Sequence, residues 1–275
     1  MNEWKPTETF DSAQGAVRWG SLGTGDPVVL LHGTPFSSVV WRDVARALAA
    51  DHRVFFWDMP GYGASAKFEG QDVSLAAQAD VFAELLRHWG PAAPAVVAHD
   101  FGGAVALRAH LLNGCAYRSL ALVDVVALAP WGSPFFRLVA ENTDVFARLP
   151  AHLHEALVGA YIASAAHGEH APGTLRELCA PWLGEDGQAA FYRQIAQADQ
   201  RHTDEVQPRY GEIDLPVLVC WGDRDTWIPP AKGRELSELI PGARHRLMEG
   251  AGHLVQLDAP AQLTAALAGF LAERG

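Results

Sequence analysis

Cysteine is scarce in this 275-residue sequence, which holds three: Cys115, Cys179 and Cys220. They are an odd number, lie far apart and form no CxxC pair, so the pattern indicates neither a disulfide framework nor a zinc cluster. The few thiols fit a reducing compartment. We therefore expect no metal site and no disulfide scaffold.

Positive charge is also in short supply. The chain has 21 Lys and Arg against 32 Asp and Glu, a formal net charge of −11. Nucleic-acid binding depends on clustered Lys and Arg, and docking on an anionic membrane surface depends on the same residues. The charge balance therefore favours neither kind of partner.

Long hydrophobic runs are missing as well. The longest, residues 120–131, is interrupted by Asp124 and is too short to span a bilayer. The opening MNEWKPTETF has no basic segment followed by an apolar one, so no signal peptide is expected. With 49% hydrophobic residues the chain can bury a substantial core. We expect a soluble, cytoplasmic protein, and the sequence leaves open whether it is a monomer or a homodimer.

What the sequence does have is short apolar runs that alternate with helical patterns. The runs expected as strands are 28–31, 54–57, 95–98, 120–123, 216–220 and 244–248. The segments with helical spacing are 38–50, 75–89, 101–112, 231–240 and 258–272. This alternation predicts an α/β fold whose mostly parallel central sheet carries helices on both faces. In such a sheet the functional site lies at the carboxyl ends of the strands.

The alternation stops between about residues 129 and 208. This stretch keeps helical patterns, proline-containing breaks and many aromatic residues, but has no strong strand. We expect a core domain from residues 1–129 and 209–275, interrupted by a helical cap inserted at 130–208.

Residues 94–103, PAVVAHDFGG, combine a buried strand, a polar pair, two glycines and the start of a helix. This is the context of a nucleophile elbow, whose usual pattern is G-x-S-x-G. Here Asp100 occupies the nucleophile position. The small residues Ala98 and Gly102 on either side permit the sharp turn, and the helix N-terminus stabilises negative charge.

Two later segments supply partners for Asp100. Asp225 ends a G-x-x-D pattern after the 216–220 strand, and His253 lies in a loop before the last helix. The order nucleophile, acid, histidine is that of the α/β-hydrolases. The segment 32–35, HGTP, follows the early strand, where one backbone donor of an oxyanion hole is expected.

Together, HGTP, DMPGYGAS, HDFGG, WGDRD and AGHLVQLDAP resemble the α/β-hydrolase superfamily over nearly the whole chain. The sequence is most similar to the branch with an aspartate nucleophile, which includes epoxide hydrolases, haloalkane dehalogenases and fluoroacetate dehalogenases. The resemblance implies a hydrolase that needs no cofactor. Some dehalogenases carry their acid after an earlier strand, which leaves Asp124 as the alternative to Asp225.

A carboxylate nucleophile points to its own chemistry. It is already charged and is suited to in-line displacement at a saturated carbon, which yields an alkyl ester of Asp100. His253 then serves as base for the water that attacks this ester, and Asp225 holds the imidazole. The backbone N–H groups of Phe101 and Thr34 receive the oxyanion.

The leaving group separates the branches. Epoxide hydrolases have cap tyrosines that donate to the ring oxygen, and Tyr192 is the candidate here, with Tyr161 as a second. Haloalkane dehalogenases usually place Trp after the nucleophile, where this chain has Phe101, although Trp131 or Trp182 could supply an indole donor. We therefore expect an epoxide hydrolase-like enzyme acting on a small, largely apolar organic substrate. The alternatives are a haloalkane dehalogenase-like hydrolase and a non-catalytic small-ligand-binding protein.

Overall fold

The computed structural model describes residues 4–90, 92–169 and 173–273, which are built around one eight-stranded sheet. The strands are β1 (Glu8–Ser12), β2 (Gly15–Leu22), β3 (Asp26–Leu31), β4 (His52–Trp57), β5 (Ala95–His99), β6 (Ser119–Val123), β7 (Val217–Gly222) and β8 (Arg244–Met248). Their order across the sheet is β1-β2-β4-β3-β5-β6-β7-β8. From β4 to β8 neighbouring strands are parallel. The predicted α/β fold with its mostly parallel sheet is confirmed.

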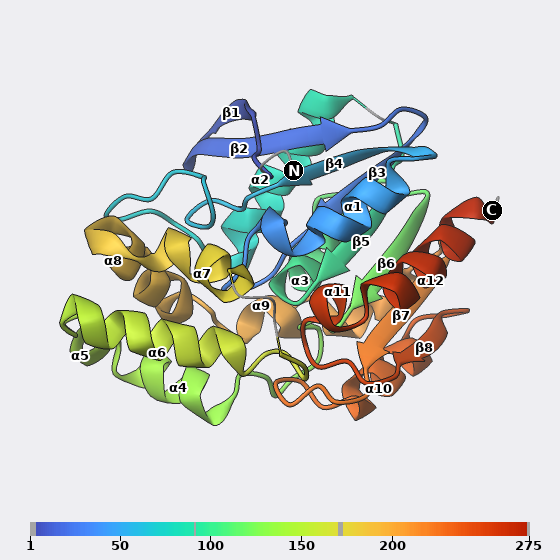
Figure 1. Cartoon of the computed structure of the whole chain (residues 1–275). Helices are drawn as coiled ribbons and strands as arrows, with labels where there is room; N and C mark the ends of the chain where they lie inside the picture. The colour runs from blue at the N-terminus through green and yellow to red at the C-terminus, as the bar shows by residue number, and fades with distance from the viewer. Residues whose placement is uncertain (1–3, 91, 170–172, 274–275) are drawn as a thin grey trace.

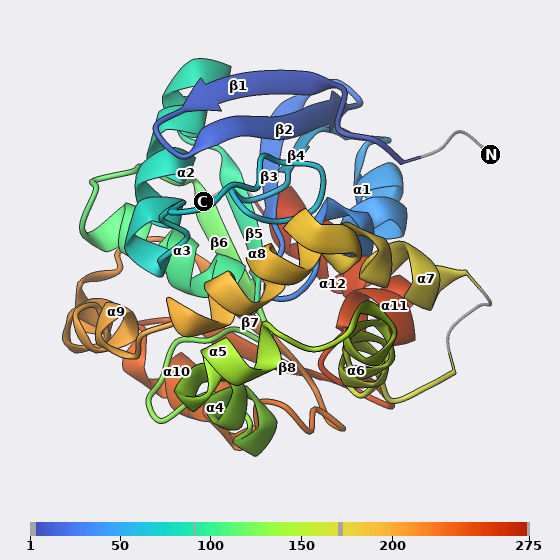
Figure 2. The ribbon, with the colours of Figure 1, turned by 90° about the vertical axis from the view of Figure 1, so that its left-hand side faces the viewer.

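Helices cover both faces of the sheet. α1 (Arg42–Leu48), preceded by the turn η1 (Ser38–Trp41), packs with α12 (Pro260–Ala272), whereas α2 (Leu75–Trp89) packs with α3 (Phe101–Leu111). Figure 2 shows these two pairs on opposite sides of the sheet. α10 (Ala231–Leu239) contacts β7 and β8, and the short α11 (Val255–Asp258) lies just before α12. Because both faces are covered, β5 and β6 are buried along their whole length, which explains their continuous apolar sequences.

The N-terminal hairpin is an addition to the strands expected from the sequence. β1 pairs antiparallel with β2, and β2 pairs antiparallel with β4. The hairpin lies at the sheet edge, and most of its residues are exposed or half-buried, with Val17 fully buried. Its sequence therefore mixes polar and apolar residues and lacks the continuous apolar runs that mark the central strands.

Between β6 and β7 the described residues form helices and no strand, and we call this helical segment the insertion. These are α4 (Pro134–Glu141), α5 (Thr143–Phe146), α6 (Ala151–Ala163), α7 (Thr174–Cys179), η2 (Ala180–Trp182), α8 (Gly184–Ala196), α9 (Arg201–Asp204) and η3 (Gln207–Glu212). Figure 1 shows α4 to α8 gathered at the left of the molecule, beside one end of the sheet. Residues 170–172 of the expected cap, and residues 1–3 and 274–275 of the expected core, lie outside the described residues.

None of the described helices is long and apolar enough to cross a lipid bilayer.

Candidate active site

The sharp turn between β5 and α3 carries Asp100. Its backbone has φ 51° and ψ −121°, a conformation that residues other than glycine rarely adopt. Close packing surrounds the turn, because a Cβ on Gly102 would lie 2.5 Å from the His32 carbonyl oxygen and one on Gly33 would lie 2.3 Å from the Asp100 Cβ. The sequence therefore needs glycine at both places, and the turn presents the Asp100 carboxylate beyond the end of the sheet.

Asp100, His253 and Asp225 lie in one buried line. The Nε2 atom of His253 is 3.4 Å from Asp100 Oδ2, and its Nδ1 is 2.9 Å from Asp225 Oδ2. The second Asp225 oxygen accepts hydrogen bonds from the backbone N–H groups of Trp227 at 2.7 Å and Ile228 at 2.9 Å. All three side chains of the line are at most 5% exposed. Asp225 therefore fixes the ring of His253 so that Nε2 faces Asp100.

Charge controls the protonation of this line. Burial lowers the pKa of His253, but the adjacent carboxylates of Asp225 and Asp100 outweigh burial and raise the pKa well above the usual 6.5. Burial raises the pKa of Asp225, but the charge and the hydrogen bond of His253 outweigh burial, so the pKa of Asp225 lies below its usual value. The neighbouring carboxylates therefore favour the protonated form of His253.

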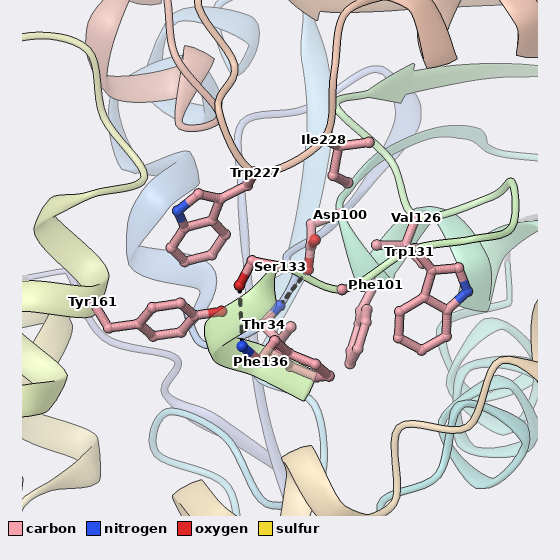
Figure 3. A pocket seen from close by; sticks show the side chains of 11 residues that line it. Thr34, Asp100, Phe101, Val126, Trp131, Ser133, Phe136, Tyr161, Trp227 and Ile228 are labelled. Carbon is pink, nitrogen blue, oxygen red and sulfur yellow. Dashed lines mark hydrogen bonds between the residues drawn. The ribbon is translucent and has the colours of Figure 1, made fainter. Parts of the chain in front are cut away.

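A backbone donor holds the other oxygen of the Asp100 carboxylate. The N–H of Thr34 donates to Asp100 Oδ1 at 2.7 Å, as the dashed line in Figure 3 shows. Phe101 is the first residue of α3, where backbone N–H groups have no partner within the helix. The Thr34 hydroxyl donates to Gln194 Oε1 at 2.7 Å, which ties this loop to α8 of the insertion. Asp100 Oδ1 thus sits where an oxyanion would be stabilised.

A small cavity opens in front of Asp100. Figure 3 shows Asp100 and Thr34 on one side and aromatic rings from the core and the insertion around it. The lining residues are Thr34, Asp100, Phe101, Val126, Trp131, Gly132, Ser133, Phe136, Tyr161, Trp227 and Ile228. The lining includes no Lys or Arg, so the cavity suits a small, uncharged and largely apolar molecule.

The two tyrosine candidates lie in different places. Tyr161 of α6 lines the cavity, and in Figure 3 its hydroxyl points inward, toward Asp100 and Ser133. Tyr192 is 1% exposed and is not part of the lining; its hydroxyl is 2.9 Å from Nδ1 of His154. The structure therefore brings Tyr161 to the site and turns Tyr192 into the packed interior of the insertion. Which face of α8 meets the cavity depends on how the insertion packs, and that information is absent from the local sequence around Tyr192.

The indole candidates already have acceptors in the protein. Trp131 lines the cavity, but its Nε1 donates to Thr203 Oγ1 at 2.9 Å. Trp182 is not part of the lining and donates to the Pro35 carbonyl oxygen at 2.6 Å. In the resting structure neither N–H is directed at a substrate.

Trp227 is a part of the site that the sequence reasoning did not identify. Its ring lies between Tyr161, 4.5 Å away by ring centroids and nearly parallel, and His253, 5.1 Å away. Its own N–H donates to Ser164 Oγ at 3.1 Å. The residue follows Asp225 by two positions in the same loop, which is the signal that could have suggested it.

The remaining acid, Asp124, is adjacent but makes different contacts. It follows β6, is fully buried, and its Oδ1 accepts a hydrogen bond from the Gly222 N–H at 2.8 Å. Asp225 is the residue in hydrogen-bonding distance of the His253 ring. This geometry supports Asp225 as the acid partner of His253.

Comparison with known proteins places this geometry in a family. Residues 26–260 match the model described as alpha/beta hydrolase fold. A crystal structure of an alpha/beta hydrolase fold protein from Burkholderia ambifaria is 47% identical, with a TM-score of 0.94 over 98% of this chain and 99% of that one.

Several curated relatives carry functional names, and two of them illustrate the range. A pimeloyl-[acyl-carrier protein] methyl ester esterase from Aeromonas salmonicida is 28% identical over 88% of this chain and 93% of its own length. The polyketide synthase ThaQ from Burkholderia thailandensis is 30% identical over 91% of this chain, and the match spans 12% of that much longer protein. With the elbow, the histidine and the acid all at the carboxyl ends of a mostly parallel sheet, the chain belongs to the α/β-hydrolase fold family and is a hydrolase.

Proposed function

We propose that this hydrolase uses Asp100 as a carbon-directed nucleophile and opens epoxides through an alkyl-enzyme ester. The observation that carries the proposal is the placement of the Asp100 carboxylate. One of its oxygens is held by the Thr34 N–H at 2.7 Å, and the other faces His253 at 3.4 Å at the edge of an apolar cavity. A carboxylate held in this way needs no base to become a nucleophile.

In the first step a carboxylate oxygen of Asp100 forms a bond to a ring carbon of the epoxide. The bond between that carbon and the ring oxygen breaks, and the oxygen takes up a proton from the Tyr161 hydroxyl. The product is a hydroxyalkyl ester of Asp100. Apolar side chains around the cavity exclude water, which strengthens the interactions of the remaining polar groups with the reacting oxygen.

In the second step water attacks the carbonyl carbon of the ester. His253 takes a proton from this water, Asp225 stabilises the resulting imidazolium, and the N–H groups of Thr34 and Phe101 hold the oxyanion. Collapse of the tetrahedral intermediate releases the diol and restores the carboxylate of Asp100. Before water attacks, His253 passes its resting proton to the phenolate of Tyr161 and becomes neutral. The proton taken from water then restores the imidazolium, and the carboxyl proton of the intermediate leaves with the diol oxygen, so the cycle closes.

The leaving group favours an epoxide over a halide. A departing halide needs N–H donors aimed at it, whereas the indole N–H groups of Trp131, Trp182 and Trp227 already bind Thr203 Oγ1, the Pro35 carbonyl and Ser164 Oγ. A departing alkoxide needs a proton donor, and the Tyr161 hydroxyl points into the cavity. Carbon–halogen hydrolysis is therefore the weaker alternative.

Ester hydrolysis is a second candidate, supported by the name of the Aeromonas relative. Attack of the Asp100 carboxylate on an ester carbonyl would give an anhydride, which is a high-energy intermediate. If Asp100 instead acted as a general base, water would attack the ester directly and no adduct would form. The two reactions thus leave different traces on Asp100.

The test is to trap the intermediate with the His253→Gln variant. Loss of the base should slow the second step about 10²–10⁴-fold and leave the first step intact. Incubation with styrene oxide should then add one substrate mass to the protein, and peptide mapping should place it on Asp100. The Asp100→Asn variant is the matched control and should give no adduct.

Heavy-oxygen water gives the complementary readout. In a single turnover of the wild-type enzyme, one label should appear in the carboxylate of Asp100, because water attacks its carbonyl carbon. Label found in the product alone would mean that water attacks the substrate directly. Rapid turnover of p-nitrophenyl esters without an adduct, together with no diol from epoxides, would favour the esterase candidate.

A further inference from the structure

Asp124 is a buried acid that takes no part in the two proposed steps. It directly follows β6 and is completely buried. Among the described residues, Asp100 and Asp124 are the two non-glycine residues with a positive φ, 51° and 46° respectively. Strained backbone of this kind persists where the surroundings enforce it, and it is common at functional sites.

The contacts of Asp124 are incomplete for a carboxylate. Its Oδ1 accepts the Gly222 N–H at 2.8 Å, but the buried Oδ2 accepts no hydrogen bond from the described residues. A carboxyl oxygen of Asp124, one of Asp225 and a ring nitrogen of His253 all lie within 4.8 Å of one another. Two buried carboxyl groups this close share one proton, because two like charges repel strongly away from water.

The hydrogen-bond donors decide which of the two acids keeps the proton. Asp225 accepts three N–H groups, from Trp227, Ile228 and the His253 ring, and these stabilise its charge. Asp124 accepts one. A proton on Asp124 Oδ2 would let this oxygen donate a hydrogen bond, so the buried atom would no longer lack a partner.

The neighbouring titratable groups agree with this assignment. Burial and the charge of Asp225 raise the pKa of Asp124 well above its usual value, despite the opposing effect of His253. Burial lowers the pKa of His99 to about 3 and raises that of Cys220 to about 12, so both neighbours are neutral. Among these neighbours, His253 is therefore the group whose protonated form the two acids favour.

We infer that Asp124 is a positioning residue that keeps its proton and donates it in a hydrogen bond to the Asp225 carboxylate, which moderates how tightly Asp225 holds the proton of His253. The inference deepens the proposed function and rests on it for the role of His253 as base. A general base is most effective when it releases its proton near the working pH. His253 faces the carboxylates of both Asp100 and Asp225, which hold its proton strongly. A neutral O–H donated to Asp225 withdraws part of that hold.

Two substitutions separate the possible roles of Asp124. Asp124→Asn keeps the shape, accepts the Gly222 N–H and offers an amide N–H to Asp225 in place of the O–H. Asp124→Ala removes both contacts. Asp225→Asn is the reference for loss of the acid partner itself.

The measurement is the rate at which the Asp100 ester disappears, followed from pH 5 to pH 9 after a single turnover. In Asp124→Ala the acid limb should move up by about one to two pH units, because the loss of a hydrogen bond to a charged group costs that much. Asp124→Asn should restore most of the lost rate and bring the limb back toward the wild-type position. Asp225→Asn should move the limb down, because an anion is removed.

The direction of the shift is decisive. If Asp124 were an anion, Asp124→Ala and Asp124→Asn would both move the limb to lower pH, and the inference would be overturned. A loss in Asp124→Asn as large as that in Asp225→Asn would also overturn it, because an amide can replace a protonated acid but not a charged one.

An infrared difference spectrum tests the proton independently of turnover and of the alanine variant. The wild-type protein at neutral pH should show the carbonyl band of a protonated carboxylic acid, and Asp124→Asn should lack it. If the band is present in both proteins or in neither, Asp124 does not carry the proton. If no ester forms in the wild-type enzyme, the proposed function fails, and the infrared band still decides the state of Asp124.

Discussion

The Tyr161 hydroxyl provides the sharpest test of the epoxide assignment. Among the described residues it makes no hydrogen bond to the protein, and its ring is stacked on Trp227 at a centroid distance of 4.5 Å with an interplanar angle of 12°. The Tyr161→Phe variant therefore keeps the stacked ring and removes only the donor. The loss of one preorganised donor to a developing oxyanion costs about 10²–10³ in rate, or about 2.7–4 kcal/mol. We expect this loss in the rate at which the Asp100 ester forms from an epoxide.

Tyr192→Phe is the matched control. It removes the 2.9 Å contact with His154 and should lower the free energy of unfolding by about 0.5–1.5 kcal/mol, with epoxide turnover retained. Stopped-flow measurement of ester formation and thermal unfolding would separate the two effects. If Tyr161→Phe opened epoxides at the wild-type rate, the leaving oxygen would have another proton donor, and the assignment of an epoxide substrate would lose its main support.

Two further changes probe the acid and the elbow. Asp225→Asn should reduce turnover about 10⁴-fold, as in Ser-His-Asp triads. The neighbouring carboxylates hold the pKa of His253 above 6.5, so wild-type turnover should fall as the pH drops through that pKa. An Asp225→Asn variant with the wild-type pH profile would contradict this role of Asp225. Gly102→Ala places a Cβ 2.5 Å from the His32 carbonyl oxygen and should destabilise the fold by about 1–3 kcal/mol; an unchanged melting temperature would show that the elbow can relax.

Local signals were sufficient for the sheet and its central motif. Continuous apolar runs predicted β3 to β7 because most residues of these strands are buried between helices on both faces. The elbow was predictable since a strand, an acidic residue and glycines adjoin one another in sequence, so the conformation of Asp100 depends on its immediate neighbours. His253 and Asp225 could be proposed in the same way, because both follow predicted strands.

The cavity wall could not be predicted in this way. Tyr161 and Tyr192 lie on different helices, and the side that each helix turns toward the core depends on packing across the whole insertion. The sequence around Tyr192 suggested the donor, whereas the structure pairs its hydroxyl with His154. Trp227 was missed for a related reason, since its contacts with Tyr161 and His253 join three segments that are distant in the sequence.

The electrostatics of the site also suggest how the two proposed steps are kept in order. In the resting enzyme His253 lies between the carboxylates of Asp100 and Asp225, and both raise its pKa. An imidazolium in this position cannot act as a base, so water near the site is not activated before a substrate arrives. Alkylation turns Asp100 into a neutral ester and removes one of the two charges. The pKa of His253 then falls when a base is first needed, and the proton it releases balances the proton taken up by the leaving oxygen. On this reasoning the nucleophile governs the base through its own charge, and no conformational change is required between the two steps.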